Sequence, residues 1–176
     1  MEGNPVKFTA AVVVFGFLSF VSADVQAQSR APKPDAQCLV TTTNGIAGED
    51  QVDPGSFGNP QVSVGPFGLW PNGTVLFQPG GAGFVTRDGS LGMKFGWRRG
   101  VSGQLKIDGR RLDAVAPALR SEVPSGYSDR GFQATYVIFP TEGCWEVTGT
   151  VGDAHVTFIT KIVKIADGPA WRRDVP

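Results

Sequence analysis

The sequence is poor in the residues that most often carry catalysis or bind metal, with one histidine, His155, and two cysteines. A zinc site with two or three histidines is therefore excluded, and Cys38 and Cys144 are too far apart to form a close-spaced ligand pair. A serine triad would have to use His155, but the chain has no Gly-x-Ser-x-Gly motif to position the nucleophile. The sequence therefore yields no candidate catalytic residue, metal ligand or cofactor site.

The sequence also lacks a net charge, because 16 Lys and Arg residues balance 16 Asp and Glu residues. A nucleic-acid-binding domain usually carries a basic excess, so we expect no nucleic-acid partner. Glycine and proline are abundant, with 24 and 13 residues, while the hydrophobic content of 41% is ordinary. This combination favours a β protein with many turns over a disordered chain.

The longest apolar run, residues 8–21, is too short for a membrane anchor, since it would extend about 21 Å as a helix against a hydrocarbon core of roughly 30 Å. It follows a single positive charge, Lys7, and precedes Val-Gln-Ala27, which has small side chains at the two positions that a signal peptidase reads. We predict a signal peptide at residues 1–27, cleaved after Ala27 with Ala23 as the second choice. The product would be an exported protein, secreted or periplasmic, with no stable membrane span after cleavage.

The rest of the chain divides into three parts. Residues 28–37 contain Pro32 and Pro34 and are expected to form a flexible lead. Residues 38–166 carry repeated strand and turn signals and are expected to form one β-sandwich domain. Residues 167–176 are expected to be a frayed tail.

In an exported protein, two cysteines predict one disulfide, Cys38–Cys144. Closing a loop of just over a hundred residues would stabilise the fold by roughly 4–5 kcal/mol in the chain-entropy account. Neighbouring strand residues point to opposite faces, so a core-facing Trp145 places Cys144 on the outside. The bridge would then hold the N-terminal segment to the outer face or rim, unlike the inter-sheet bridge of antibody domains. Free thiols and intermolecular pairing are the alternatives.

Residues 131–165 are expected to form three strands side by side. Apolar side chains fall on odd positions in residues 145–151, and residues 152–153 are a two-residue turn signal that leads into a β-branched return strand. In the preceding strand the apolar set is predicted to face the core with Val147 and Phe158. That set is Phe132, Ala134, Tyr136 and Ile138.

Two further alternating segments, residues 91–98 and 105–108, flank a five-residue loop at residues 99–103 and predict a hairpin in which Gln104 pairs with Arg98. In this register Trp97 would lie opposite Leu105 in the same sheet. The polar face of the hairpin would then carry Arg98 and Lys106. Another hairpin is expected at residues 69–77, around a Pro-Asn-Gly turn.

Two groups of residues are candidates for ligand contact. Trp70 and Tyr127 lie in expected loops, where aromatic side chains either contact ligands or cover the ends of the core. The second group is basic and would form either a patch for anionic envelope polymers or an ordinary solvated face. Its members are Arg98, Lys106, Arg110 and Arg130.

Carboxylate pairs provide the only route to an enzyme that the composition leaves open. Glu142 and Glu146 would suit acid–base chemistry on a glycan if they faced each other across a cleft. The alternative is that the two carboxylates have no catalytic role, because charged residues are common at strand ends on a solvent-exposed face. Residues 78–83 are glycine-rich but lack the Gly-Lys-Ser/Thr ending of a phosphate-binding loop.

Several motifs resemble a group of small exported bacterial proteins of unassigned function. They are LWPNGTV at 69–75, GRRLDA at 109–114, FPTEGCWEVTG at 139–149 and GDA at 152–154. The resemblance covers residues 38–165 and implies an immunoglobulin-like β-sandwich, without any site residues.

Together these observations predict an all-β fold, an immunoglobulin-like antiparallel sandwich of about seven to nine short strands in two sheets. The expected function is a non-catalytic binding or structural module of the bacterial cell envelope, whose partner is an envelope glycan or another envelope protein. The alternative is a glycan-processing or other hydrolytic enzyme.

Overall fold

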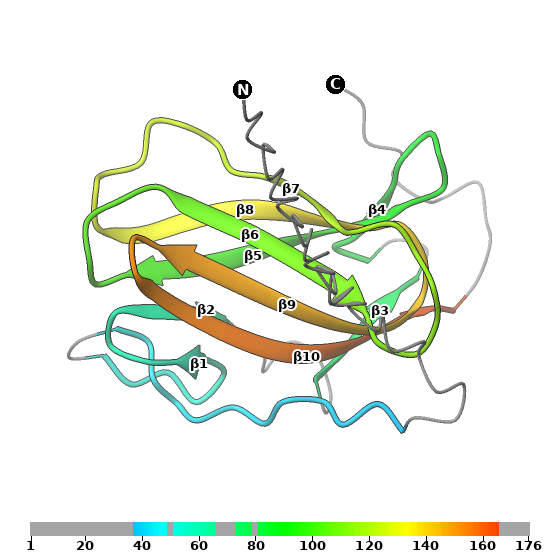
Figure 1. Ribbon diagram of the computed structural model, residues 1–176, viewed down its shortest axis with the longest axis horizontal. Helices are drawn as coiled ribbons and strands as arrows, with labels where there is room; N and C mark the ends of the chain where they lie inside the picture. Colours follow the sequence, from blue (N-terminus) through cyan, green and yellow to red (C-terminus); the bar gives the residue numbers. More distant parts are fainter. Residues whose placement is uncertain (1–36, 49–50, 66–72, 79–80, 166–176) are drawn as a thin grey trace, which may run out of the picture. The chain divides into compact units, whose positions relative to one another are not determined.

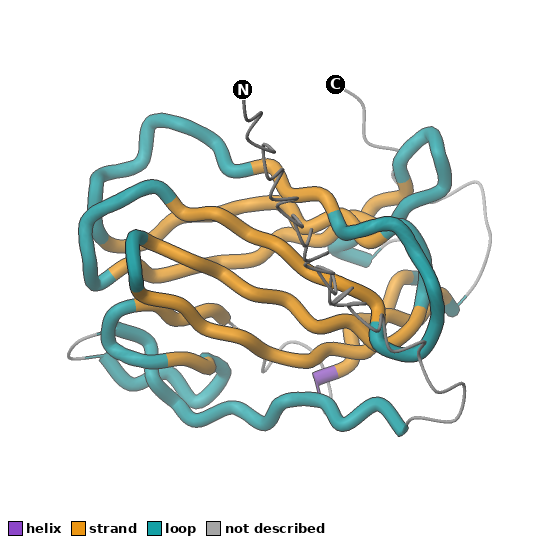
Figure 2. Tube along the Cα trace, viewed as in Figure 1, coloured by secondary structure: helices purple, strands orange, loops and turns teal. Residues whose placement is uncertain are grey.

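The computed structural model describes residues 37–48, 51–65, 73–78 and 81–165. Internal contacts divide the chain after Arg30, and all described residues belong to the second unit. The predicted signal peptide and its cleavage site, Trp70 and the tail therefore lie outside the described residues. The described part contains strands joined by loops and no α-helix, and the short purple segment in Figure 2 is 3₁₀ geometry at Gly73, directly before β3.

The strands of the described part form two sheets that face each other (Figure 1). The first sheet has the order β1-β2-β5-β8-β7, with β4 also paired to β5, and the second has the order β3-β10-β9-β6. The strands of the first sheet are β1 (Phe57–Gly58), β2 (Val62–Gly65), β4 (Phe84–Val85), β5 (Leu91–Arg99), β7 (Arg120–Glu122) and β8 (Gly131–Phe139). Those of the second are β3 (Thr74–Phe77), β6 (Leu105–Arg111), β9 (Gly143–Val151) and β10 (Ala154–Lys164).

The all-β, two-sheet prediction is confirmed, with two differences of detail. Ten strands are present in the described part, two of which, β1 and β4, are only two residues long. The sandwich is also not wholly antiparallel, since β3 pairs in parallel with β10. The hairpin expected at residues 69–77 falls partly outside the described residues, and its second half is β3.

One hydrophobic core fills the space between the sheets. Phe95 of β5 stacks on Phe158 of β10, with ring centroids 6.0 Å apart, and Phe139 of β8 packs edge-on against Trp145 of β9 at 5.6 Å. All four rings are fully buried. The core therefore depends on side chains from both sheets, as expected of a sandwich.

Trp97 joins the two sheets most directly. Its Nε1 donates a hydrogen bond to Oγ1 of Thr135 within the first sheet, at 3.0 Å. Its ring lies against Gly149 of the second sheet, where an added Cβ would stand 2.1 Å from Cζ3 of the tryptophan. Only glycine at position 149 leaves room for this ring.

The predicted hairpin of β9 and β10 is confirmed. The strands pair antiparallel from Val151 and Ala154 outward, and Gly152 in the turn has a φ of 59°, a left-handed conformation that suits glycine. Trp145 and Val147 face the core, as their alternation predicts.

The hairpin predicted between β5 and β6 is wrong. β5 pairs with β2, β4 and β8 in the first sheet, whereas β6 pairs with β9 in the second. Trp97 and Leu105 are both buried, so the core positions are right, but they lie in opposing sheets. A five-residue loop is long enough to cross between the layers, and burial alone does not distinguish the two connections.

The predicted position and orientation of β8 are also wrong. It lies in the first sheet, beside β5 and β7, and not beside β9. Val137 and Phe139 face the core, while Tyr136 is half-buried on the outer face. Both faces of β8 carry apolar residues, so alternation could not determine which one is inside.

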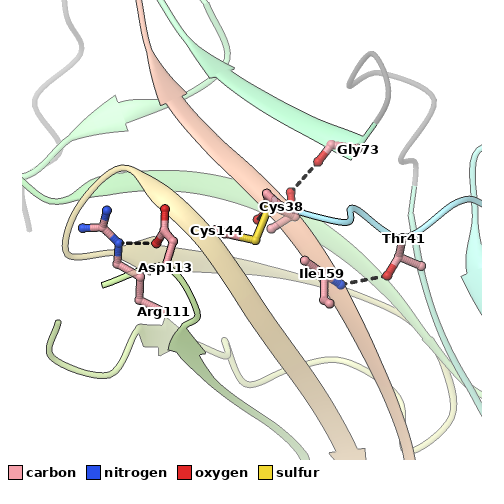
Figure 3. The surroundings of a disulfide bond; sticks show 8 residues. Cys38, Thr41, Gly73, Arg111, Asp113, Cys144 and Ile159 are labelled. Atoms are coloured by element: carbon pink, nitrogen blue, oxygen red, sulfur yellow. Dashed lines mark hydrogen bonds and ion pairs between the residues drawn. A yellow bond between two sulfur atoms is a disulfide. The ribbon is translucent and has the colours of Figure 1, made fainter. Parts of the chain in front are cut away.

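The Cys38–Cys144 disulfide is present, with the two Cα atoms 5.5 Å apart (Figure 3). Cys144 points away from the core, because its neighbour Trp145 is fully buried in it. Beyond the bridge, the Thr41 amide donates to the Ile159 carbonyl at 2.9 Å, and the Ile159 amide donates to Oγ1 of Thr41 at 2.8 Å. The N-terminal segment is thus held along the outside of β10, as predicted.

Candidate functional site

Three of the predicted ligand-contacting residues lie at one end of the first sheet. Arg98 is near the end of β5, Arg130 directly precedes β8, and Tyr127 lies in the loop between β7 and β8. Figure 1 shows this loop beside the loop that follows β5, at the left of the view. Phe132 pairs with Arg98 in the β5–β8 ladder. We call Arg98, Tyr127, Arg130 and Phe132 the arginine–aromatic end.

Two buried polar side chains position these loops. Arg99, only 6% exposed, donates from Nη1 to the Gly103 carbonyl at 2.9 Å and from Nη2 to the Ser128 carbonyl. Gln133, also buried, donates from Nε2 to the Pro124 carbonyl at 3.0 Å. Since a buried donor is costly to leave unpaired, these contacts restrict the loop that carries Tyr127.

The aromatic pair of this end is exposed. Tyr127 and Phe132 meet edge to face with ring centroids 6.4 Å apart, and they remain 40% and 51% exposed. The Phe132 ring lies over Gly96, where a Cβ would stand 2.8 Å from its Cε2 atom. Exposed rings next to each other are a common ligand-contacting feature, whereas a single exposed apolar residue is not informative.

Arg98 differs from the other arginines of the outer faces. It is half-buried, yet no described residue forms a hydrogen bond or ion pair with its guanidinium. Three other arginines have carboxylate partners within the described part of the chain. These pairs are Arg110–Glu146 at 2.8 Å, Arg111–Asp113 at 2.6 Å and Arg120–Asp88 at 2.8 Å.

Two pockets meet at Arg98. The larger, of about 300 Å³, is lined by three arginines and by no acidic side chain among the described residues. Its lining comprises Ala47, Gly48, Gln51, Arg98, Arg99, Gly100, Arg130 and Gly131. Glu49 and Asp50 fall between two lining residues in the sequence but lie outside the described residues.

The smaller pocket, of about 130 Å³, is lined by polar and apolar residues in equal number. It is lined by Asp53, Ser56, Ser63, Val64, Gly65, Gly96, Arg98 and Phe132. Asp53 already accepts hydrogen bonds from the Gly55 amide and from Oγ of Ser56, both at 3.0 Å. The hydroxyl of Ser63, a residue only 1% exposed, has no partner among the described residues.

The nearest acidic group that titrates abnormally is Asp129. Hydrogen bonds from the Ser102 side chain and the Gly103 amide, together with the positive charges of Arg99 and Arg130, lower the pKa of its carboxyl. Asp129 therefore stays ionised and neutralises part of the charge of Arg130. Arg98 shares the smaller pocket with Asp53, but no described acidic residue forms an ion pair with it.

The basic patch predicted from four residues is not formed. Arg98 and Arg130 share the larger pocket of the first sheet, whereas Lys106 and Arg110 lie on β6 of the second sheet. The patch depended on the β5–β6 hairpin, so it fails together with that pairing. Trp70 lies outside the described residues.

Glu142 and Glu146 are each engaged by another group. Oε1 of Glu142 accepts a hydrogen bond from the Lys164 amide, and Glu146 forms the ion pair with Arg110. The resolved pKa shifts of the described carboxyl groups, at Asp88, Asp113 and Asp129, are all downward. A general acid needs the opposite shift, so nothing in this part of the chain favours the enzymatic alternative.

A third pocket, of about 290 Å³, lies at the other end of β8. Its lining has two positive side chains, Arg87 and Arg120, and two negative ones, Asp88 and Glu122. The hydrogen bond from Arg120 is the main cause of the lowered pKa of Asp88. Because its charges balance, this pocket is a weaker candidate for an anionic ligand than the arginine–aromatic end.

Sequence reasoning missed four residues of the site. Arg99 was placed in the loop of the predicted β5–β6 hairpin, Gln133 alternated with the residues assigned to the core, Phe132 was assigned to the core, and Ser63 was not considered. The one available signal was the second apolar set of β8, Val137 and Phe139, which places Gln133 inside and Phe132 outside.

Within the described residues, no three His, Cys, Asp or Glu side chains gather in a way that would hold a metal ion. The same residues include no helix that is long and apolar enough to cross a membrane. No protein-family profile, curated protein or solved structure matches this chain.

Proposed function

We propose that this protein is an exported, non-catalytic binding module of the bacterial cell envelope, and that it holds an anionic envelope glycan at its arginine–aromatic end. The observation that carries the proposal is Arg98, a half-buried guanidinium without a described partner that lines two pockets beside an exposed aromatic pair. Partly buried arginines normally have anionic partners, because removing the charge from water is costly.

The neighbouring groups suit the same ligand. Arg130 adds a second positive charge to the larger pocket, and guanidinium groups bind carboxylates and phosphates through two parallel hydrogen bonds. Tyr127 and Phe132 provide apolar surface on which the face of a sugar ring can pack. Charge and aromatic surface therefore occur together at this end.

Export is supported by the disulfide. Disulfides form and persist in oxidising compartments, and the Cys38–Cys144 bridge fits the signal peptide that we expect at residues 1–27. We further infer membership of the group of small exported proteins that the sequence motifs resemble, with an immunoglobulin-like topology. The two packed sheets, joined by connections that cross from one to the other, support this inference.

The proposal is tested by co-sedimentation of the purified protein with isolated cell-wall and outer-membrane glycans at two salt concentrations. The double variant Arg98→Ala/Arg130→Ala should lose most of the binding. The control Lys106→Ala/Arg110→Ala removes the same charge from the other sheet and should retain it. Absence of salt-sensitive binding by the wild type, or equal losses in both variants, would refute the proposed function.

A further inference from the structure

We propose that the arginine–aromatic end recognises a single anionic sugar unit, a pyranose that carries a carboxylate or a phosphate, and not an anionic group alone. This inference rests on the proposed function and specifies its ligand. It follows from the two pockets that share Arg98, one of them charged and the other rich in hydrogen-bonding groups.

The anionic substituent would occupy the larger pocket. No described residue accepts a hydrogen bond from the Arg98 guanidinium, and the one described acceptor for Arg130 is Oγ of Ser102, which takes a bond from Nε at 3.2 Å. Two guanidinium groups on one anion provide a directional, charge-assisted contact. This pocket by itself would accept any small anion.

The smaller pocket adds the requirement for hydroxyl groups. Ser63 lies directly opposite Arg98 in the β2–β5 ladder, and its hydroxyl is buried without a partner. A buried hydroxyl without a hydrogen bond costs about 1–3 kcal/mol, so a hydroxyl group of a ligand in this pocket would recover that cost by bonding to it. A volume of about 130 Å³ admits the edge of one sugar ring.

Phe132 connects the two pockets. It pairs with Arg98 across the ladder, lines the smaller pocket and is 51% exposed. A pyranose packed against this ring would direct one edge toward Ser63 and its anionic substituent toward Arg98. Gly65 and Gly96 also line the smaller pocket and leave no room for a side chain, because a Cβ at either position would collide with Ser56 or with the Gly65 carbonyl.

The site is tested by calorimetric titration of the disulfide-bonded, exported protein with glucuronic acid, glucose 6-phosphate, glucose and inorganic phosphate at constant ionic strength. The first two ligands should bind at least about tenfold more tightly than the last two, because each of the latter lacks one half of the contact. Inorganic phosphate that binds as tightly as glucose 6-phosphate would overturn the inference in favour of a simple anion site.

Ser63→Ala separates a ligand contact from a structural role. The substitution removes a hydroxyl that makes no hydrogen bond in the protein, so the melting temperature should stay equal or rise. Affinity for both charged sugars should nevertheless fall roughly threefold to tenfold, the effect of one hydrogen bond. Unchanged affinity in Ser63→Ala would contradict the assignment.

Two further variants, Arg98→Ala and its control Lys106→Ala, test the contact with the anionic substituent. Arg98→Ala should weaken both charged sugars by about tenfold or more, while Lys106→Ala, on the other sheet, should stay within about twofold of the wild type. If charged sugars fail to bind but envelope glycans still sediment in an Arg98-dependent manner, the single-sugar inference is wrong and the proposed function stands. If neither binds, both are wrong.

Discussion

The outer faces of the two sheets have opposite chemistry. On the second sheet two pairs of polar side chains bond to each other, Thr148 with Thr157 at 2.8 Å and Arg110 with Glu146 at 2.8 Å. The first sheet exposes an apolar ring, Phe132, beside Arg98, which no described residue neutralises. We therefore assign the ligand to the first face and not to the second.

The difference originates in the two central strands. β9 alternates strictly, with apolar residues toward the core and polar residues outward. β8 is apolar on both sides, with Val137 and Phe139 inward and Ala134 and Ile138 outward. A strand that is apolar on both faces is typical of a sheet with something packed against it, and Phe84 of β4 packs against Tyr136 on the outer face of β8, with ring centroids 5.3 Å apart.

The largest expected effect on stability comes from removing the disulfide, a change confined to the second sheet. Cys38→Ser/Cys144→Ser removes the bridge on the second sheet and should lower the free energy of unfolding by about 2–5 kcal/mol. Glycan binding should persist wherever the variant remains folded, because the bridge lies on the other sheet. Urea denaturation and co-sedimentation below the unfolding midpoint measure the two properties. Loss of binding by the folded variant would show that the faces are not independent.

The contact that joins the two sheets should have the next largest effect. Gly149→Ala places a methyl group against the Trp97 ring and should lower the free energy of unfolding by about 1–3 kcal/mol. Thr150→Ala, the adjacent outward-facing position, is the matched control and should change stability by less than about 0.5 kcal/mol. Equal effects at the two positions would contradict the described packing.

Arg99→Met tests whether a buried side chain organises the available face. The substitution leaves the Gly103 and Ser128 carbonyls without their donor, so residues 124–130 should exchange amide hydrogens faster while the sheets stay protected. Glycan affinity should also fall, because this loop carries Tyr127 and is less ordered in the variant. Arg87→Met, an exposed position, is the control. Unchanged exchange at residues 124–130 would exclude a tethering role for Arg99.

The smallest expected effect concerns acid stability near the disulfide. Burial raises the pKa of Asp113, but hydrogen bonds from Arg111 and the Cys144 amide outweigh it, so the pKa lies below its usual value. The resulting stabilisation is present above the unfolded pKa of about 3.9 and is lost as the pH falls through the lower folded value. Asp113→Asn should therefore be less stable than the wild type at pH 7, with the difference shrinking below about pH 4. A difference that grows in acid would contradict the assigned sign.

Some of this fold could be predicted because certain signals in the sequence have one interpretation. Residues 145–151 have only one apolar face, and the two cysteines of an exported chain have one intramolecular pairing. The β9–β10 hairpin, its core-facing side and the disulfide follow directly from these facts.

Other parts of the sequence were compatible with two arrangements. The short loop between β5 and β6 fits a hairpin as well as a crossing between sheets, and β8 is apolar on both sides. The candidate site was therefore only half predicted. Arg98, Arg130 and Tyr127 could be named from residue type, but Ser63 and Arg99 acquire their roles through non-local burial, which a local pattern does not reveal.

The most direct measurement is a residue-resolved NMR titration of the exported protein with an anionic glycan fragment. Amide signals of Arg98, Arg130 and Phe132 should shift in a saturable manner, while those of Thr148 and Thr157 stay constant. Shifts on the second sheet alone, or uniform shifts that disappear with moderate salt, would contradict an available first sheet and a satisfied second one.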